Sequence, residues 1–187
     1  MTKALKYQRS EPKIVHQNPF YKISLVQVNF GDFRKDYYVS DFGQRVGVLL
    51  LKEGQVLLTR QYRFVIDDLA WEIPGGAVDE DETVKEAALR ECYEETGVQC
   101  RNLEKLISYQ QSLDIIRTPT HIFYTDKFVE DPRHKSSPDE VAKCQWVDFE
   151  ECFKMIDAGE IVDGFTVLGL MTYKNKVFNK CQSLLKK

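Results

Sequence analysis

The sequence has no apolar run that approaches the roughly 18 residues of a membrane-spanning helix, so we expect no membrane span. Its N-terminal segment, MTKALKYQRSEPK, contains no apolar stretch, which argues against a signal peptide. Basic residues are not in excess, because 26 Lys and Arg stand against 29 Asp and Glu. The net charge of −3 and the pI of about 5.7 argue against partners such as nucleic acid or an acidic membrane surface.

The cysteines show no pattern typical of a disulfide framework or a zinc site. They form no CxxC pair and are odd in number, so we expect reduced thiols in a cytoplasmic protein. The five positions are Cys92, Cys100, Cys144, Cys152 and Cys181. The sequence also has no internal repeat and no low-complexity tract. Its 187 residues, 43% hydrophobic and 12% aromatic, are enough for one domain with a real core and a small accessory element.

Runs of β-branched and aromatic residues predict the strands. Residues 21–30 and 36–39 flank a Gly31-Asp32 turn and predict a small N-terminal antiparallel sheet. A boundary near residue 42 would separate an N-terminal β element, residues 1–42, from a second domain, residues 43–187. That domain is expected to contain a hairpin around the turn Lys52-Glu53-Gly54-Gln55. Its predicted strands are 46–51, 56–62, 103–111, 121–128 and 143–147.

Capping signals predict two helices, and the spacing of apolar residues predicts a third. Thr83 and Glu86 form an S/T-x-x-E capping box, and Gly97 is a good C-terminal cap, so a helix is expected between them. A second helix is expected at 150–158, capped by Asp148 and Glu151 and ending at Gly159. A third is expected at 165–185. Strands around one short helix, with further helices outside, predict an α/β sandwich.

Three glutamates share one face of the first predicted helix. Glu91, Glu94 and Glu95 stand at i, i+3 and i+4, so their carboxylates repel one another unless a cation lies between them. Carboxylate oxygens are hard ligands that favour Mg²⁺ or Mn²⁺. The alternative is an acidic helix face that is simply solvated, which is common in a chain with 29 acidic residues.

The whole stretch from Gly76 to Val98, GAVDEDETVKEAALRECYEETGV, is more specific than the glutamates alone. It resembles the Nudix box, G-x5-E-x7-R-E-U-x-E-E-x-G-U, in which U is aliphatic. Every glycine and polar position matches, and the one departure is Cys92 at the first U, where a small buried hydrophobe is acceptable. The resemblance implies a Nudix-type α/β/α sandwich with a mixed central sheet, preceded here by the N-terminal antiparallel β element.

The resemblance also assigns roles to the box residues. Glu91 and Glu95 would be the main metal ligands, and Glu94 would bridge metals or position water. In this family the carbonyl just before the box glycine often completes the metal shell, which points to Gly75; the alternative is that Pro74-Gly75-Gly76 is only a turn. Arg90 and Glu82 would support the acidic cluster from behind, although a plain helix salt bridge is also open.

Two segments upstream resemble one branch of the family, which cleaves ADP-ribose and other nucleoside diphosphate sugars. Gln61-Tyr62-Arg63 resembles the EQxR segment, and Trp71-Glu72-Ile73-Pro74 resembles W-E-L-P. Arg63 would bind two phosphate oxygens with its guanidinium fork, the alternative being a surface arginine. Glu72 and Arg45 are weaker candidates for substrate contacts. Trp71 is more simply explained as a core residue.

A late carboxylate is expected in the polar loop Ser137-Pro138-Asp139-Glu140-Val141. In this branch such a residue is a metal ligand or the base for the attacking water. Glu140 matches best and Asp139 second; the alternative is that both are merely solvated. One departure weakens ADP-ribose as the specific substrate, because Leu113 stands where those enzymes commonly carry a proline.

These resemblances predict a Mg²⁺-dependent hydrolase, with Mn²⁺ possible, in which Glu94, Glu95 and Glu140 are catalytic. The expected substrate is a nucleoside diphosphate sugar, ADP-ribose first and GDP-mannose or a similar compound second. The alternatives are clean-up of nucleoside triphosphates and a non-catalytic Nudix regulator that binds a ligand. Sugar-nucleotide Nudix enzymes pair through an N-terminal sheet, so a homodimer is expected.

Overall fold

The computed structural model describes residues 7–134 and 141–178, and it divides the chain into two compact units. One unit combines the N-terminal residues up to Gln44 with the segment Tyr109–Thr120. The other combines Arg45–Ser108 with the described residues from His121 onward. The sequence pattern predicts a boundary near residue 42, but it gives no sign that residues 109–120 join the N-terminal unit.

The N-terminal unit is built on a long antiparallel hairpin of β3 and β4. Its register runs from Lys22 opposite Asp41 to Asn29 opposite Arg34, and Gly31 in the connecting turn has φ of 95°. Two short strands, β1 and β2, pair antiparallel with β3, and β11 pairs parallel with β4. The strands are β1 (Gln8–Arg9), β2 (Lys13–Gln17), β3 (Lys22–Asn29), β4 (Arg34–Asp41) and β11 (Ile116–Arg117). The predicted N-terminal antiparallel sheet is therefore present.

The second unit contains a larger sheet in the order β10-β12-β5-β6-β14, with β7 beside β6 and β8 beside β5. Its central hairpin turns at Glu53 and Gly54, whose φ values of 50° and 81° are those of a tight left-handed two-residue turn. A separate ribbon pairs β9 with β13. The strands are β5 (Arg45–Lys52), β6 (Gln55–Arg63), β7 (Asp68–Glu72), β8 (Gly75–Ala77), β9 (Val98–Cys100), β10 (Glu104–Gln110), β12 (Pro119–Thr125), β13 (Phe128–Glu130) and β14 (Lys143–Asp148).

The first two helices begin and end close to where the sequence predicts. Helix α1 (Val84–Thr96) has the complete capping box of Thr83 and Glu86, and Gly97 closes it in the left-handed conformation with φ of 70°. Helix α2 (Phe149–Asp157) is capped by the Asp148 side chain, which accepts from two backbone amides. Of the two residues expected to cap this helix, Asp148 does so, whereas the Glu151 side chain accepts from Lys154.

The third helix is shorter than predicted. Helix α3 (Gly164–Tyr173) starts after the cap Asp163 and passes at Lys174–Phe178 into a π-helical turn. The prediction of one regular helix over 165–185 is therefore wrong from residue 174, and residues 179–185 lie outside the described part. Periodicity over apolar residues does not distinguish an α-helix from such a local change in hydrogen bonding.

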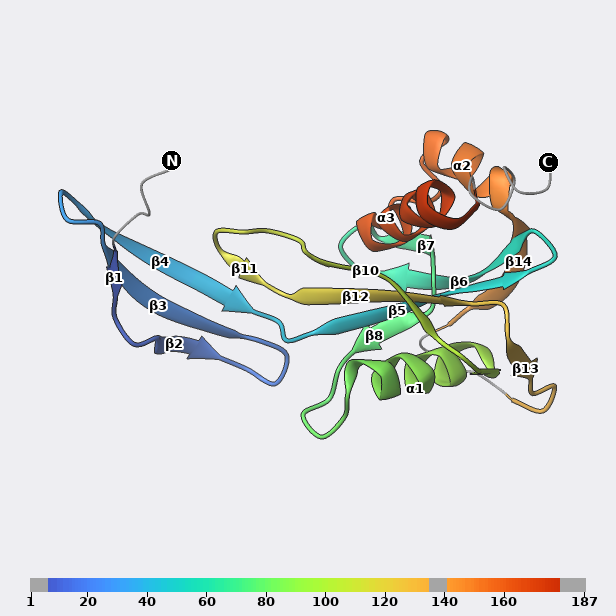
Figure 1. Cartoon of the computed structure of the whole chain (residues 1–187), viewed down its shortest axis with the longest axis horizontal. Coiled ribbons are helices and arrows are strands. Elements are labelled where there is room, and N and C mark those ends of the chain that lie inside the picture. The colour runs from blue at the N-terminus through green and yellow to red at the C-terminus, as the bar shows by residue number, and fades with distance from the viewer. Residues whose placement is uncertain (1–6, 135–140, 179–187) are drawn as a thin grey trace. The chain divides into compact units, whose positions relative to one another are not determined.

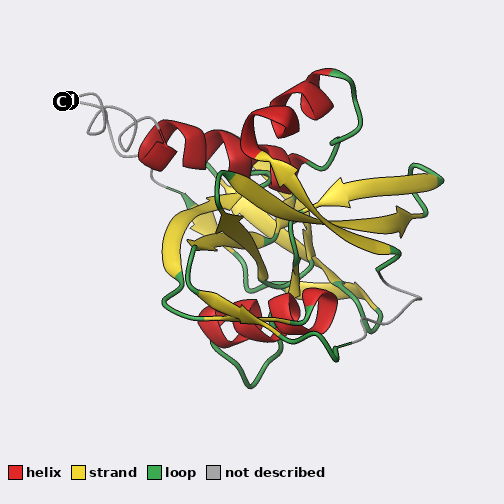
Figure 2. Ribbon diagram, turned by 90° about the vertical axis from the view of Figure 1, so that its right-hand side faces the viewer, coloured by secondary structure: helices red, strands yellow, loops and turns green. Residues whose placement is uncertain are grey.

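Within the second unit, α1 lies on one face of the large sheet, and α2 and α3 lie on the other (Figures 1 and 2). On the α1 face, Ala88 and Cys92 of the helix belong to one buried cluster with Val48 and Leu50 of β5. On the opposite face, Gly169 of α3 lies against the side chains of Leu49, Ile73 and Ile122. The sheet is covered on both faces, as the predicted α/β sandwich requires. Among the described residues, no helix is long and apolar enough to cross a membrane.

Candidate active site

Two glycines allow close approaches at this edge of the sheet, one between β8 and β5 and one between β8 and the acidic helix. Gly75 and Gly76 form β8, which pairs antiparallel with Gly47 and Val46 of β5. A Cβ atom at Gly76 would fall on the carboxylate of Glu91, and one at Gly75 would fall on the backbone of Val46. A side chain at Gly76 would therefore push α1 away or displace the Glu91 carboxylate, and one at Gly75 would disturb the pairing of β8 with β5. The Pro-Gly-Gly segment is therefore more than a turn.

The carboxylate of Glu95 is buried between two neutral donors. The backbone amide of Gly75 donates to Oε2 over 2.9 Å, and the side-chain amide of Gln61 donates to Oε1 over 2.6 Å. Only 8% of Glu95 is exposed, and this burial raises the pKa of its carboxyl group to about 7. Within the described ranges, no Lys, Arg or His nitrogen forms an ion pair with Glu95.

Glu91 and Glu94 converge on one nitrogen of Arg90. The Nη1 atom of Arg90 donates to Glu91 over 2.9 Å and to Glu94 over 3.1 Å. Glu91 is largely buried, and burial raises the pKa of its carboxyl group even though Arg90 acts in the opposite direction. Glu94 is the open member of the group, with 55% of its side chain exposed. The helix therefore presents two desolvated carboxylates and one solvated carboxylate.

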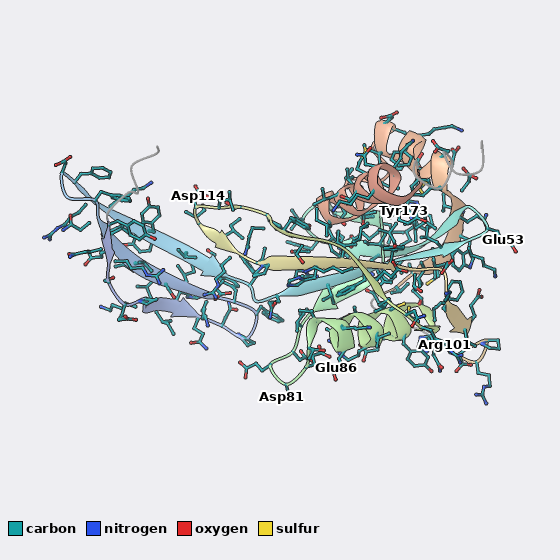
Figure 3. The ribbon with its side chains drawn as sticks, in the orientation of Figure 1. Glu53, Asp81, Glu86, Arg101, Asp114 and Tyr173 are labelled. Carbon is teal, nitrogen blue, oxygen red and sulfur yellow. The ribbon has the colours of Figure 1, made fainter. Side chains whose placement is uncertain are left out.

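The other side of Arg90 holds the loop that leads into α1. Its Nε donates to Glu82 over 3.1 Å, and its Nη2 donates to Glu82 and to the carbonyl of Ala77. Glu82 in turn accepts from the amide of Asp79 over 2.9 Å. Figure 3 shows Asp81 in this loop and Glu86 at the start of the helix. Arg90 thus joins the loop before the helix to two of the helix glutamates, as expected for a supporting residue.

Arg63 of β6 and Glu72 of β7 form an ion pair diagonally across the paired strands, because the register places Arg63 opposite Asp68 and Glu72 opposite Thr59. The guanidinium donates from Nε over 2.7 Å and from Nη2 over 2.5 Å, one bond to each carboxylate oxygen. This bidentate pair raises the pKa of Arg63, and 42% of the arginine side chain stays exposed. In the described part of the chain, Nη1 of Arg63 has no hydrogen bond. The guanidinium is therefore fixed along one edge and available along another.

The remaining predicted residues have different environments. Trp71 is a core residue, 8% exposed, as predicted. Arg45 is exposed at the start of β5, and its positive charge opposes, without overcoming, the rise that burial causes in the pKa of Glu91. Glu140 and Asp139 lie outside the described residues, so the late carboxylate stays a prediction.

Gln61 is a site residue to which the sequence pattern assigned no role. It lies on β6 two residues before Arg63, so both side chains point to the same face of the sheet. Besides Glu95, its amide donates to the hydroxyl of Thr59 over 3.2 Å. The alternation of residues along a strand could have indicated that Gln61 shares a face with Arg63. It could not have identified the partner of Gln61, because Glu95 is 34 residues away in the sequence.

A divalent cation requires several oxygen ligands that converge on one point. Among described residues, no three Asp, Glu, His or Cys side chains are arranged to hold a metal ion jointly. Glu91 and Glu94 are instead drawn to Arg90, and Glu95 is bonded to amides. Two buried carboxylates on one helix face, one of them without an ion-pair partner in this part of the chain, nevertheless have the chemistry of a site for a hard cation.

Comparison with known proteins now adds to this geometry. The family model for the NUDIX domain matches residues 41–164. A CMP-5'-(N-acetyl-N-hydroxy-3-aminopropyl)phosphonate hydrolase from Streptomyces rubellomurinus is 29% identical over 85% of this chain and 78% of its own. An ADP-ribose pyrophosphatase from Bacillus subtilis is 25% identical over 78% of this chain and 79% of its own.

A solved structure shares the fold over nearly the whole chain. It is described as the crystal structure of an ADP compounds hydrolase, and it aligns with a TM-score of 0.81 over 96% of this chain and 98% of its own. At 16% identity this likeness concerns the fold alone. The predicted fold class is confirmed. The resemblance to the Nudix family and to its ADP-ribose branch is confirmed as well.

Proposed function

The chain belongs to the Nudix family of hydrolases, and we propose that it cleaves the diphosphate bond of a nucleoside diphosphate sugar with the help of a divalent cation. ADP-ribose is the first candidate substrate, and the products would be AMP and ribose 5-phosphate. One observation carries the proposal: the desolvated carboxylates of Glu91 and Glu95 lie against the glycine strand β8.

The cation would be Mg²⁺, with Mn²⁺ as a substitute, since Nudix hydrolases generally use divalent metals. Glu91 and Glu95 would hold it, with Glu94, the Gly75 carbonyl and Glu140 as further ligands. When bound, the cation supplies the positive charge that the buried carboxylates and the diphosphate oxygens both require. Binding would have to release Glu91 and Glu94 from Arg90, which keeps its bonds to Glu82.

Arg63 is the proposed substrate clamp. Because Glu72 fixes two nitrogens of its guanidinium, the free Nη1 edge is held ready to donate to a phosphate oxygen without a search through rotamers. Glu72 and Arg45 are proposed as further substrate contacts. Gln61 holds Glu95 in place, and Glu94 or Glu140 would accept the proton of the attacking water.

A second candidate substrate comes from the relative at 29% identity, whose name describes hydrolysis of a CMP-linked phosphonate. It matches a larger share of this chain than the ADP-ribose pyrophosphatase does, so a cytidine compound belongs beside GDP-mannose among the alternatives. Nucleoside triphosphate clean-up and a purely binding role are the remaining ones. The intact set of box glutamates favours catalysis over binding alone.

We also propose that the N-terminal sheet supports a homodimer in the cytoplasm. Several large apolar side chains of the N-terminal unit are exposed, among them Phe20 at 83% and Phe33 at 58%. Exposed aromatic groups of this kind are common in interfaces. Sedimentation at micromolar concentration tests the pairing, and a monomer there would refute it. Fractionation of cells tests the location, and recovery with membranes or outside the cell would refute it.

Product analysis over a substrate panel tests the proposed activity. The panel contains ADP-ribose, GDP-mannose, UDP-glucose, NADH, a CMP-linked phosphonate, diadenosine polyphosphates and nucleoside triphosphates, each with Mg²⁺ and with Mn²⁺. Release of AMP from ADP-ribose supports the first candidate, and CMP or GMP from its conjugate would select the corresponding alternative. Pyrophosphate from triphosphates would indicate the clean-up activity. Tight binding without turnover of any compound would refute the hydrolase mechanism.

A further inference from the structure

Two cysteine sulfur atoms lie in direct contact beside the acidic helix. The Sγ of Cys92, on α1, and the Sγ of Cys100, at the end of β9, are 3.1 Å apart. This is closer than an ordinary non-bonded contact between sulfur atoms. A disulfide bond measures about 2.05 Å between its sulfurs, so a displacement of about 1 Å would bring the pair to bonding distance.

The chain reversal after α1 produces this contact. Gly97 ends the helix in the left-handed conformation, and β9 follows at once. Val98 and Cys100 lie on the same side of β9 because alternate strand residues share a face, and Val98 is buried in the α1 core. Arg101, which directly follows Cys100, lies near the C-terminal end of α1 (Figure 3).

The two thiols differ in access to solvent. Cys92 is fully buried, and its sulfur is further placed by the carbonyl of Val98 at 3.6 Å and the hydroxyl of Thr96 at 3.8 Å. Cys100 is only partly buried. A dissolved oxidant therefore reaches Cys100 first, and Cys92 is held where it can attack whatever forms there.

Other cysteines in the described part of the chain lack such a neighbour. The thiol of Cys144 donates a hydrogen bond to the backbone carbonyl of Glu95, and Cys152 is buried on α2. Neither has a second sulfur within hydrogen-bonding distance in the described ranges. Cys152 is thus a matched control, since it is also a buried helical cysteine.

We propose that Cys92 and Cys100 are a site of oxidative modification, at which a peroxide converts the two thiols into an intramolecular disulfide. The Cys100 thiolate attacks a peroxide oxygen, forming a sulfenic acid, and the other oxygen leaves as water or an alcohol. The Cys92 sulfur then attacks the Cys100 sulfur, and the hydroxyl group leaves as a second water. In sum, the two thiols lose two protons and two electrons, and the peroxide accepts them. This step does not depend on which substrate the protein hydrolyses.

The chain offers a direct readout by mass spectrometry. Trypsin cleaves after Arg90 and Arg101, so both cysteines lie in the one peptide Glu91–Arg101. The full-length folded protein would be treated with hydrogen peroxide, alkylated, and digested without reduction. The expected peptide is lighter than the dithiol by two hydrogens and carries no alkyl group, and dithiothreitol restores double alkylation.

Variants separate the disulfide from general oxidation. In Cys152→Ser the bridged peptide should form as in the wild type, whereas in Cys100→Ser it should be absent. In Cys92→Ser the sulfenic acid at Cys100 should persist and be trapped by dimedone. Circular dichroism confirms that each variant is folded. The proposal is overturned if wild-type protein, oxidised while folded, keeps both cysteines alkylatable, or if Cys100 is found bridged to another cysteine.

Discussion

Burial of Glu95 should make the metal-free protein lose stability as the pH rises. The folded-state pKa of about 7 lies above the ordinary value of 4.5, so between these values the folded state binds more protons than the unfolded state. Stability is then highest below pH 4.5 with respect to this group and falls as the pH rises through 7. The difference corresponds to roughly 3 kcal/mol of unfolding free energy.

Other groups titrate in or near the same range, so the variant Glu95→Gln is needed to isolate this contribution. Burial lowers the pKa of His121, which makes stability rise with pH near neutrality, and the raised pKa of Glu91 acts in the same direction as Glu95. Both remain in the variant. The measured quantity is therefore the difference between wild type and Glu95→Gln.

Urea unfolding at pH 5.0 and pH 7.5, after treatment with a chelator, would give the free energy of unfolding of the wild type and of Glu95→Gln at each pH. The wild type should lose roughly 2–3 kcal/mol more than the variant between these pH values. Adding Mg²⁺ at pH 7.5 should restore wild-type stability and leave the variant nearly unchanged, because a bound cation favours the ionised carboxylate. An equal pH dependence in the two proteins would refute the argument that Glu95 is desolvated and without a cation.

Three further substitutions test the surrounding structure. Arg63→Lys should raise KM about tenfold or more with a smaller effect on kcat, because lysine cannot keep the bidentate bond to Glu72 and also donate to phosphate. Lys52→Arg is the control, and an unchanged KM in Arg63→Lys would exclude Arg63 as the clamp. Gly76→Ala should disrupt metal-dependent activity, since the added Cβ falls on Glu91, whereas Gly164→Ala should not, because the space beside Gly164 is open. Thermal melting would show that both variants are folded. Equal activities of the two variants would contradict the close approach of α1 to β8. Gln61→Leu should lower kcat by roughly 10-fold or more through a misplaced Glu95 and leave KM little changed, and a KM effect alone would instead make Gln61 a substrate contact.

The sequence predicts those parts of the structure that depend on local signals. The capping box at Thr83 and the left-handed Gly97 gave the bounds of α1, and the Glu53-Gly54 turn gave the central hairpin, because each depends on neighbours only a few residues away. Strands β3 and β4 followed from their β-branched and aromatic residues, whereas β1, β2 and β11 of the same sheet were not predicted. The short strands β7 and β8 were not predicted, since three to five residues around Pro74 and two glycines carry no periodicity.

The candidate site was predicted in its composition and less completely in its contacts. The box spacing selected Glu91, Glu94 and Glu95, but their different burial depends on how α1 packs on β8. The pair of Arg63 with Glu72 and the bond of Gln61 to Glu95 join residues on different strands or elements. Such long-range partners are fixed by tertiary packing, which one sequence does not reveal.

The most direct test of the central claim is the release of AMP from ADP-ribose by wild-type protein and by Glu95→Gln at saturating Mg²⁺. We expect metal-dependent turnover by the wild type and a loss of at least about 10²-fold in kcat for the variant, because a neutral amide could not replace the buried carboxylate in its proposed role as a metal ligand. Circular dichroism and urea unfolding would show that the variant is folded. Near-normal turnover by folded Glu95→Gln would contradict the assignment of the site.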